Sequence, residues 1–461
     1  MTIQNNLNAA IAATRFGLGA RAGEIDAARG DPRGFLLAQI RDSGADPTRQ
    51  TPATSAQRMA AYFAFKAARS TDKQDGPQAK VETKKDRGQL RDDASNDFMD
   101  RLQLAISTPD SFRERWALFW LNHFTISSAK ANTQGLAGPF ENEAIRPRVF
   151  GRFEDMLVAS SSHPAMLYYL DEARSIGPDS ITAQNQMRNG KHPGLNENLA
   201  REIMELHTVG LEAGYSQADV TEFARAMTGW GVAGERDPVN LDGKFIFHER
   251  SHEPGARTIM GKRYVDEGDA QARSVMRDLA ANPHTAHHLA VKIARHFVAD
   301  EPPPALVDRL KRSYLANDGH LAAVARTLVE AAEAWEPTPR KFKTPYEFLA
   351  SAYRSAGTSP NDTPSAVATM TTMGQKPLAP PSPKGWPEEA QVWCAPDAIV
   401  KRMNWSANFA ANIVGDFDPR QVASIALGER LKPSTTTAIA RAETRGEGLA
   451  IMLMSPEFQR R

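Results

Sequence analysis

Residues 194–230 read GLNENLAREIMELHTVGLEAGYSQADVTEFARAMTGW and carry the clearest helical pattern in the chain. Their apolar side chains recur about every three to four positions, which is typical of helices that bury one face in a core. An Asn-Glu-Asn triplet opens the first expected helix, over 197–209. A capping box formed by Ser216 and Asp219 opens the second, which ends before Gly229-Trp230. This stretch predicts two amphipathic helices, each with one charged side.

The charged side of the first helix is the strongest candidate site. At about 100° per residue, Glu197, Asn198, Arg201, Glu202 and Glu205 fall within an arc of about 140°. Glu202 and Glu205 lie about 60° apart, which lets them share a cation or a substrate hydroxyl. The same pattern also fits a salt ladder of Glu197, Arg201 and Glu205 at i, i+4 spacing. Both interpretations stay open.

The second helix repeats this arrangement with Asp219 and Arg225. A carboxylate in the first turn of a helix is favoured by the positive end of the helix dipole, and this explains Asp219 as a cap. Arg225 lies further along the same stripe. We expect it either to pair with a carboxylate of the preceding helix or to bind an anionic ligand. Asn196 stands just before the first helix and is expected to contact the same substrate.

Composition narrows the classes of function. The 461 residues contain 56 basic and 55 acidic side chains, a formal net charge of +1. Nucleic-acid binding needs a basic footprint, so we expect no nucleic-acid partner. No apolar run approaches the roughly 20 residues that a membrane-spanning helix requires, so none is expected. The single cysteine, Cys394, allows no internal disulfide framework.

The N-terminal residues MTIQNNLNAAIAATRFGLGAR show no positive segment before an apolar core and no cleavage site. A cytoplasmic location is therefore expected by default. Export to the periplasm together with a partner is the alternative.

The rest of the chain predicts a mainly α-helical fold, a globular array of many helices with one small hairpin or minor sheet. Residues 1–65 form an N-terminal helical segment. Residues 66–96 are dense in Lys, Asp, Gln and Gly and are expected to be a mobile polar insertion, with a long solvated helix as the alternative. Residues 97–300 form the central helical core, and residues 301–461 a C-terminal helical lobe with a proline-rich loop at 377–387.

Residues 244–264 alternate and turn like a β-hairpin, and they contain the string His248-Glu249-Arg250-Ser251-His252. Zinc proteases carry H-E-x-x-H on a regular helix, which places both imidazoles on one face. Strand-like residues precede this string and Pro254-Gly255 follows it, so no room for a helix remains. No metal ligand is assigned here. His252 alone, in a loop, is kept as a substrate-binding candidate.

Histidines elsewhere give mixed signals. His123 shares a face with Trp116, Phe119 and Trp120, and we expect it to be buried, either as a core residue or as a general acid or base. In the catalytic case its carboxylate partner would be Glu141 or Glu143. His163 precedes Pro164 and is expected to cap the helix that follows. The histidines within 284–296 are expected at the surface or at the rim of a site.

The segment PPSPKGWP places Trp386 in an exposed loop, where it forms either an aromatic wall of a pocket or a packing lid. No glycine-rich phosphate loop, nucleophile elbow or metal-binding cysteine spacing is present. No redox cofactor motif is found either.

Eight motifs occur in one order along the chain: RFGLGAR, RERWALFWLNHFTIS, HPAMLYYLDEARS, GLNENLAREIMELHTVG, GYSQADVTEFARAMTGW, HEPGARTIMGKRY, GQKPLAPPSPKGWP and LMSPEF. Together they cover nearly the whole sequence. The chain resembles the bacterial domain-of-unknown-function 1800 family, for which no function is established. The resemblance implies a mainly helical bacterial protein, often encoded beside a sulfatase- or phosphatase-like protein with a twin-arginine signal. At His207 an aromatic residue is common in the family, so the imidazole is not expected to be functional.

Three hypotheses follow. The first is a hydrolase-like enzyme acting on a polar or anionic substrate. In it Glu202 and Glu205 serve as acid and base or bind calcium or magnesium, and His123 assists. The other residues of the helix pair, with the His252 and Trp386 loops, would line the cleft. The second is a non-catalytic helical partner of the sulfatase- or phosphatase-like protein, and the third is a metal-binding protein.

Overall fold

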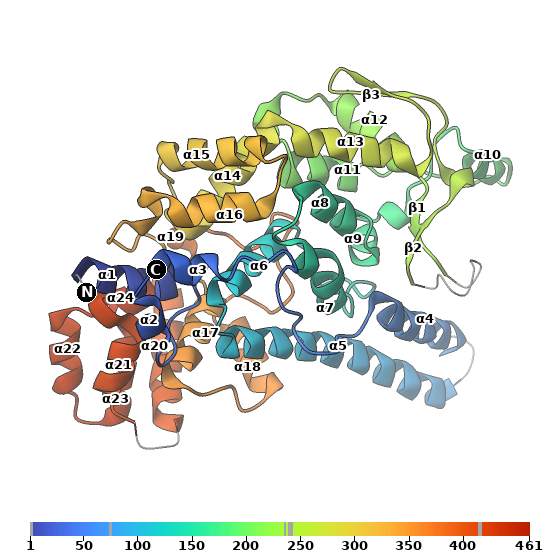
Figure 1. Ribbon diagram of the computed structural model, residues 1–461. Coiled ribbons are helices and arrows are strands. Elements are labelled where there is room, and N and C mark those ends of the chain that lie inside the picture. Colours follow the sequence, from blue (N-terminus) through green and yellow to red (C-terminus); the bar gives the residue numbers. More distant parts are fainter. Residues whose placement is uncertain (1–2, 73–75, 235–236, 238–242, 414–416) are drawn as a thin grey trace.

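The computed structural model describes residues 3–72, 76–234, 237, 243–413 and 417–461, and no side chain within residues 65–87. The described residues form 24 α-helices, several shorter helical turns and four short strands (Figure 1). The predicted mainly α-helical class is confirmed.

The helices up to residue 230 are, in order, α1 Ile3–Ile11, α2 Glu24–Ala28, α3 Pro32–Leu37, α4 Ser55–Asp72, α5 Gly76–Ser107, α6 Ser111–His123, α7 Ala137–Phe140, α8 Phe153–Ser161, α9 Pro164–Tyr169, α10 Ile181–Arg188, α11 Asn198–Glu202 and α12 Gln217–Met227. Those that follow are α13 Asp269–Ala281, α14 Pro283–Phe297, α15 Pro304–Ala316, α16 Leu321–Glu330, α17 Pro345–Ala356, α18 Thr363–Thr372, α19 Ala390–Trp393, α20 Pro396–Asn412, α21 Pro419–Leu427, α22 Pro433–Ala440, α23 Arg445–Met454 and α24 Pro456–Gln459.

The strands make two small antiparallel sheets rather than the one expected. β1 (Trp230–Val232) pairs with β2 (Phe245–Phe247), and β3 (Arg257–Ile259) pairs with β4 (Lys262–Tyr264). Met260 and Gly261 turn the second hairpin with φ of 47° and 77°. Positive φ at both positions matches the twist of the flanking strands, and glycine adopts it without strain. The sequence correctly predicted a hairpin, formed by β3 and β4. β2 is not part of it and pairs instead with β1, the strand that precedes it in the chain.

α6 is the helix around which the fold is built (Figure 1). Of its 13 residues, 10 are buried, including Phe112, Trp116 and Trp120. A helix that is buried on nearly all sides must sit inside the core rather than on its surface. Trp116 satisfies its indole N–H by donating to the Val149 carbonyl at 2.7 Å. α6 therefore presents side chains to several neighbouring elements at once.

The described parts of residues 66–96, 66–72 and 76–96, belong to α4 and α5, which lie side by side as an antiparallel pair (Figure 1). Of the two alternatives for this stretch, the structure describes helices. Residues 73–75 lie outside the described residues, and the mobility of the stretch stays a prediction. The C-terminal part of α5 packs against α17 and α18.

The two ends of the chain lie together (Figure 1). α1 contacts the helical turn Gly428–Arg430 that follows α21. One large apolar core extends through most of the molecule. A smaller one is formed by α17, α20, α21, α23 and their neighbours, with Phe348, Leu449 and Met452 at its centre. The proposed division into lobes at residue 300 stays a prediction.

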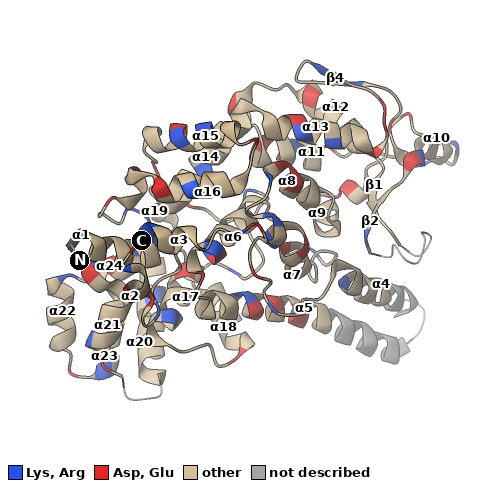
Figure 2. Cartoon of the chain, viewed as in Figure 1, with Lys and Arg blue, Asp and Glu red and all other residues tan. Residues whose placement is uncertain are grey.

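Acidic and basic residues are both spread over the helices, as Figure 2 shows. Among the described residues, no helix is both long enough and apolar enough to cross a membrane.

Candidate functional site

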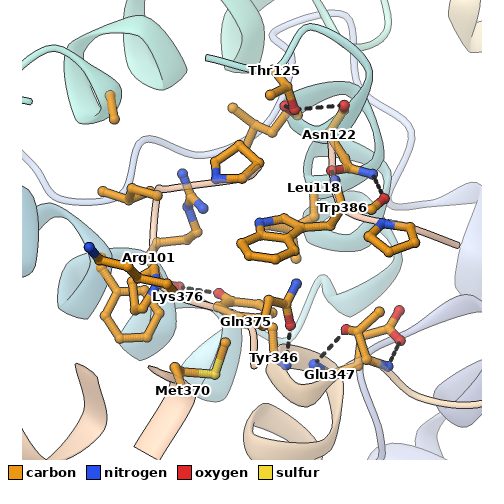
Figure 3. Close-up of a pocket in the computed structure, with 18 of the residues that line it drawn as sticks. Arg101, Leu118, Asn122, Thr125, Tyr346, Glu347, Met370, Gln375, Lys376 and Trp386 are labelled. Carbon is orange, nitrogen blue, oxygen red and sulfur yellow. Dashed lines mark hydrogen bonds between the residues drawn. The ribbon is translucent and has the colours of Figure 1, made fainter. Parts of the chain in front are cut away.

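A pocket lies between α6 and the loop of residues 373–389, which joins α18 to α19. This loop contains the proline-rich stretch 377–387, and the whole of it is called the proline-rich loop from here on. α5, α7, α14, α17 and α18 contribute the other sides of the pocket (Figure 3). Its cavity volume is about 130 Å³. Its lining residues are Leu18, Phe98, Arg101, Arg115, Leu118, Leu121, Asn122, Thr125, Ile126, Ala137, Phe140, His296, Thr344, Tyr346, Glu347, Met370, Gln375, Lys376, Pro377, Leu378, Pro380, Trp386, Pro387 and Glu388.

Asn122 of α6 holds the proline-rich loop through the backbone of Trp386. Its Oδ1 accepts a hydrogen bond from the Trp386 N–H at 2.7 Å, and its Nδ2 donates to the Trp386 carbonyl at 3.0 Å. Gly385 has a φ of 86°, and a Cβ there would lie 2.6 Å from the Asn122 carbonyl oxygen. Only glycine combines this conformation with so close an approach. The Gly-Trp pair therefore serves to set Trp386 against α6.

The walls of the pocket are mostly apolar. The half-buried Trp386 lines the pocket together with Phe98, Leu118 and Met370. Figure 3 shows the indole of Trp386 inside the ring of lining residues. Gln375 fastens the loop to α17, because its Oε1 accepts from the Tyr346 N–H at 2.8 Å. An indole among aliphatic and aromatic side chains is suited to a flat or chain-like apolar group.

Two cations, Arg101 and Lys376, lie at one end of the pocket (Figure 3). Arg101 is engaged, since its Nε and Nη2 contact Glu141 Oε2 at 2.7 and 2.5 Å. Lys376 is exposed, and its side chain makes no hydrogen bond or ion pair with any described residue. Lys376 is therefore available to an anionic ligand.

A buried ion network centred on Glu347 forms part of the pocket floor. Its carboxylate is paired with Arg115 of α6 and with Arg461, whose Nε and Nη2 lie 3.1 and 3.0 Å from it. Glu347 also completes the capping box of α17, accepting from the Thr344 N–H at 2.9 Å. Burial opposes ionisation of Glu347, but the two guanidinium groups outweigh it and lower its pKa. The network joins α6, α17 and the last residue.

A second polar pair on the floor joins α14 to the proline-rich loop. His296 Nδ1 lies 2.9 Å from Glu388 Oε1. Lys341 donates to the Glu388 carbonyl and to Asp300 Oδ1, both at 2.5 Å. Burial opposes the charge on Glu388, but His296 and Lys341 outweigh it and lower the pKa to about 2. Burial lowers the pKa of His296 below 6.5 despite the pull of Glu388.

Among the residues proposed from the sequence, Trp386 lines this pocket, and none from α11 or α12 does. The regular helix expected over 197–209 is also interrupted. α11 ends at Glu202, and a π-helical turn, Ile203–His207, follows it. Thr208 Oγ1 donates to the Ile203 carbonyl at 2.7 Å, which stabilises the wider turn. A constant 100° per residue does not hold beyond Glu202.

Glu197 and Arg201 form the predicted ladder, with a distance of 3.0 Å between Oε2 and Nη2. α12 extends it, because Gln217 Nε2 and Thr221 Oγ1 donate to Glu197 at 2.8 and 2.6 Å. Glu205 makes no ion pair with a described residue, so the ladder stops at Arg201. Hydrogen bonding by Thr221, ahead of the other contacts, lowers the pKa of Glu197. Glu197 is thus engaged in holding the two helices together.

Glu202 and Glu205 are half-buried neighbours. Burial, and then the nearby charge of Glu205, raise the pKa of Glu202. Neither carboxylate has a hydrogen-bond partner among the described residues. Their predicted catalytic roles are untested.

The remaining polar residues of the helix pair have local partners. Asn196 Oδ1 accepts from the Asn198 N–H at 2.9 Å and so caps α11. The predicted capping box of Ser216 and Asp219 is confirmed, and Asp219 also accepts from the Met260 N–H at 2.6 Å. Arg225 bonds Glu222 of its own helix at 2.5 Å, not a carboxylate of α11.

His252 is buried, and its loop is tied to the end of α12. Its Nδ1 lies 2.9 Å from the Thr228 carbonyl, and the N–H of Glu253 donates to Thr228 Oγ1 at 2.8 Å. The stretch between β2 and His252 is a short turn, Glu249–Ser251, as the argument against a zinc-protease helix required. A substrate-binding role for His252 stays a prediction.

His123 is buried as expected, but neither predicted carboxylate partner contacts it. Its Nε2 lies 3.1 Å from the His207 carbonyl. Glu141 is bound by Arg101 and Arg146, and Glu143 by His163. This expectation was wrong because both carboxylates are already engaged by other side chains, Glu141 by two arginines and Glu143 by His163 and Ser55.

His163 does cap α9 as predicted. Its Nδ1 accepts from the Ala165 N–H at 3.1 Å, and its Nε2 lies 3.0 Å from Glu143. Both ring nitrogens therefore have partners.

The floor of the pocket was not found from the sequence. His296 was expected at a surface or rim, but it is 7% exposed. Its partners Phe119 and Glu388 belong to distant segments, the latter 92 positions away. The one local signal was that Glu388 closely follows the Gly-Trp-Pro motif.

Within the described residues, no group of three or more His, Cys, Asp or Glu side chains is arranged to hold a metal ion. Glu202 and Glu205 offer two carboxylates, whereas Ca²⁺ takes about six to eight oxygen ligands. A divalent cation at this pair stays a prediction.

Comparison with known proteins gives a family but no function. No curated protein matches the chain, and no solved structure does. A family model described as "Protein of unknown function (DUF1800)" matches residues 11–460, nearly the whole chain. The sequence resemblance is thereby confirmed, and the chain belongs to the DUF1800 family.

Proposed function

We propose that the protein binds a small organic acid with an apolar body in the pocket beneath the proline-rich loop. The observation that carries this proposal is the pairing of an apolar, Trp386-lined wall with a free cation, Lys376, at one end. Apolar burial supplies most of the affinity of such sites, and a few polar groups fix the orientation. The ligand lies along the indole, with its acidic group toward Lys376.

The walls of the pocket are held in place by hydrogen bonds, which supports binding of the ligand without a large rearrangement. Asn122 fixes both backbone polar groups of Trp386, and Gln375 ties the loop to α17. A site that is already ordered loses less conformational entropy when its ligand binds. The pocket is therefore suited to a specific ligand.

The test is a fluorescence titration with 8-anilinonaphthalene-1-sulfonate, an aromatic sulfonate of the proposed chemical class. We expect one molecule to bind per chain. Trp386→Ala should weaken binding about tenfold, because it removes an aromatic contact of roughly 1–2 kcal/mol. Lys376→Gln should weaken it a few-fold and reduce its dependence on salt.

Lys384→Gln is the matched control, since Lys384 is an exposed lysine of the same loop that does not line the pocket. Its affinity should equal that of the unchanged protein. Equal affinity in Trp386→Ala would contradict the proposal.

Hydrolysis at α11 is a second proposal, favoured by the raised pKa of half-buried Glu202 beside Glu205. A carboxyl group with a raised pKa beside a second carboxylate is suited to general acid catalysis. Glu205→Gln should fold normally and lose activity toward a panel of ester and glycoside substrates. A large loss of thermal stability would instead indicate that Glu205 has a structural role.

A protein partner, the sulfatase- or phosphatase-like protein of the sequence hypothesis, is a separate proposal. Co-export with it would place this chain in the periplasm, whereas the chain alone is expected in the cytoplasm. Exposed apolar side chains that a partner would cover include Val400 and Met403 on one turn of α20, 53% and 52% exposed. Co-purification from the native host tests it, and recovery as an isolated monomer would argue against it.

A further inference from the structure

His296 and Glu388 form a hydrogen-bonded pair on the pocket floor, where both residues contribute to the lining. His296 comes from the last turn of α14, and Glu388 follows Trp386 by two residues. The distance of 2.9 Å between Nδ1 and Oε1 is that of a charge-assisted hydrogen bond. The carboxylate therefore fixes the orientation of the imidazole.

The hydrogen bond also fixes the tautomer. An ionised Glu388 only accepts, so the proton lies on His296 Nδ1 and the lone pair on Nε2. That Nε2 is buried and has no hydrogen-bond partner among the described residues, and the same is true of Glu388 Oε2. Unsatisfied buried polar atoms are rare in native proteins and require an explanation.

His163 shows what a structural histidine looks like in this chain. Both of its ring nitrogens are satisfied, one by the Ala165 N–H and the other by Glu143. Unpartnered buried ring nitrogens also occur at His123, His207 and His252, so an open nitrogen alone does not distinguish His296. What distinguishes His296 is the carboxylate that is hydrogen-bonded to its other ring nitrogen. A carboxylate-oriented imidazole with a free lone pair is the arrangement of a general base.

Charged groups from every neighbouring element act on His296. The pKa of His296 is affected by Arg115 of α6, Arg461 at the chain end and Glu388 of the loop. His296 in turn contributes to lowering the pKa of Glu347 of α17. Burial and the two guanidinium groups lower its pKa, and Glu388 opposes them. The imidazole is thus neutral near pH 7, which is the form that accepts a proton.

We infer that His296, oriented by Glu388, is the general base of an esterase reaction in which the acid bound by the pocket is the acyl part of an ester. This inference rests on the proposed binding function. His296 Nε2 removes a proton from water while the water oxygen bonds to the ester carbonyl carbon. The carbon–oxygen bond to the alcohol then breaks, and the proton passes from Nε2 to the departing alkoxide. Glu388 is a positioning residue that retains the Nδ1 proton and stabilises the imidazolium.

The test uses the full-length protein and mono-4-nitrophenyl glutarate, an ester whose acyl group ends in a carboxylate. Nitrophenolate release should exceed the buffer rate and should rise with pH along a limb whose midpoint lies below 6.5, the ordinary pKa of histidine. His296→Gln should lose about 100-fold in rate, the lower end of what a general base contributes. Its circular dichroism should be unchanged, which shows that the variant folds. His284→Gln, which alters an exposed histidine of the same helix, should match the unchanged protein.

Two further variants separate chemistry from folding. His296→Gly should regain part of its rate when imidazole is added, because the free base replaces the missing ring. Glu388→Gln should be slower, and its pH limb should move to lower pH because the charge that raises the imidazole pKa is gone.

Binding of the sulfonate with no ester hydrolysis above the buffer rate would overturn the esterase inference alone. Absence of sulfonate binding would overturn the binding proposal as well. An undiminished rate in folded His296→Gln would exclude His296 as the base.

Discussion

The charged face of the α11–α12 pair and the floor of the pocket use the same residue types in opposite ways. On the helix pair, Glu197 and Arg201 are four positions apart and 30% and 38% exposed. On the pocket floor, Arg115 and Glu347 are 232 positions apart and buried. Exposed local pairs contribute little to stability, whereas a buried charge that loses its partner is costly. The dense charge pattern in the sequence therefore marked the weaker of the two networks.

Glu347→Gln should have the largest effect on this comparison. It leaves Arg115 and Arg461 without the negative charge that they share, whereas the glutamine oxygen can still accept from the Thr344 N–H. We expect a loss of about 3–5 kcal/mol in the free energy of unfolding, measured by urea denaturation. A loss below about 1 kcal/mol would show that the buried ion network of the pocket floor contributes no more to stability than the exposed ion pair of the α11–α12 surface.

The buried side of the π-helical turn should make the protein sensitive to acid. His207 is 1% exposed, its ring nitrogens have no partner among the described residues, and burial lowers its pKa to about 3. Between pH 6.5 and about 3 the unfolded chain therefore binds a proton that the folded protein does not. Stability should fall with falling pH in this window by about 1.4 kcal/mol per pH unit for this group.

His207→Phe should remove that contribution and flatten the dependence of the melting temperature on pH. An equal slope in both proteins would show that other groups cause the acid sensitivity.

Gly385→Ala should disturb the pocket without touching its charges. The new Cβ would lie 2.6 Å from the Asn122 carbonyl oxygen in a left-handed backbone conformation. We expect a loss of roughly 1–3 kcal/mol and weaker binding of 8-anilinonaphthalene-1-sulfonate. Gly374→Ala is the control, because its φ is also positive but no atom lies within 4 Å of the added Cβ. Equal losses would show that backbone conformation, rather than contact with α6, decides the effect.

Glu197→Gln should have the smallest effect. It removes a half-exposed ion pair but retains an oxygen that accepts from Thr221. A change of a few tenths of a kcal/mol in urea denaturation is expected, and it should shrink further in high salt. A loss as large as that of Glu347→Gln would remove the distinction between the two regions.

The residues that were predicted well are those with local causes. Asp219 caps α12 through Ser216, and His163 caps α9, because both motifs depend on neighbours within three positions. The π-helical turn at Ile203–His207 was missed, and its His207 packs against His123 of α6 and Phe124, from a segment more than 80 positions away. The partner of His123 was missed for the same reason. Trp386 was placed at a pocket wall or lid from its motif alone, but the identity of the opposing wall was not visible.

The sequence alone determined the helical class, the caps, the second hairpin and the family, because each follows from residues close together in the chain or from motif order. Only the tertiary structure decided where a pocket lies and which charges are buried. It brings Arg115, Glu347, Glu388 and Arg461 together from segments far apart in the chain. The contribution of an ion pair to stability depends on how much water surrounds it. Tertiary packing sets that exposure to water, and the spacing of the two residues in the sequence does not.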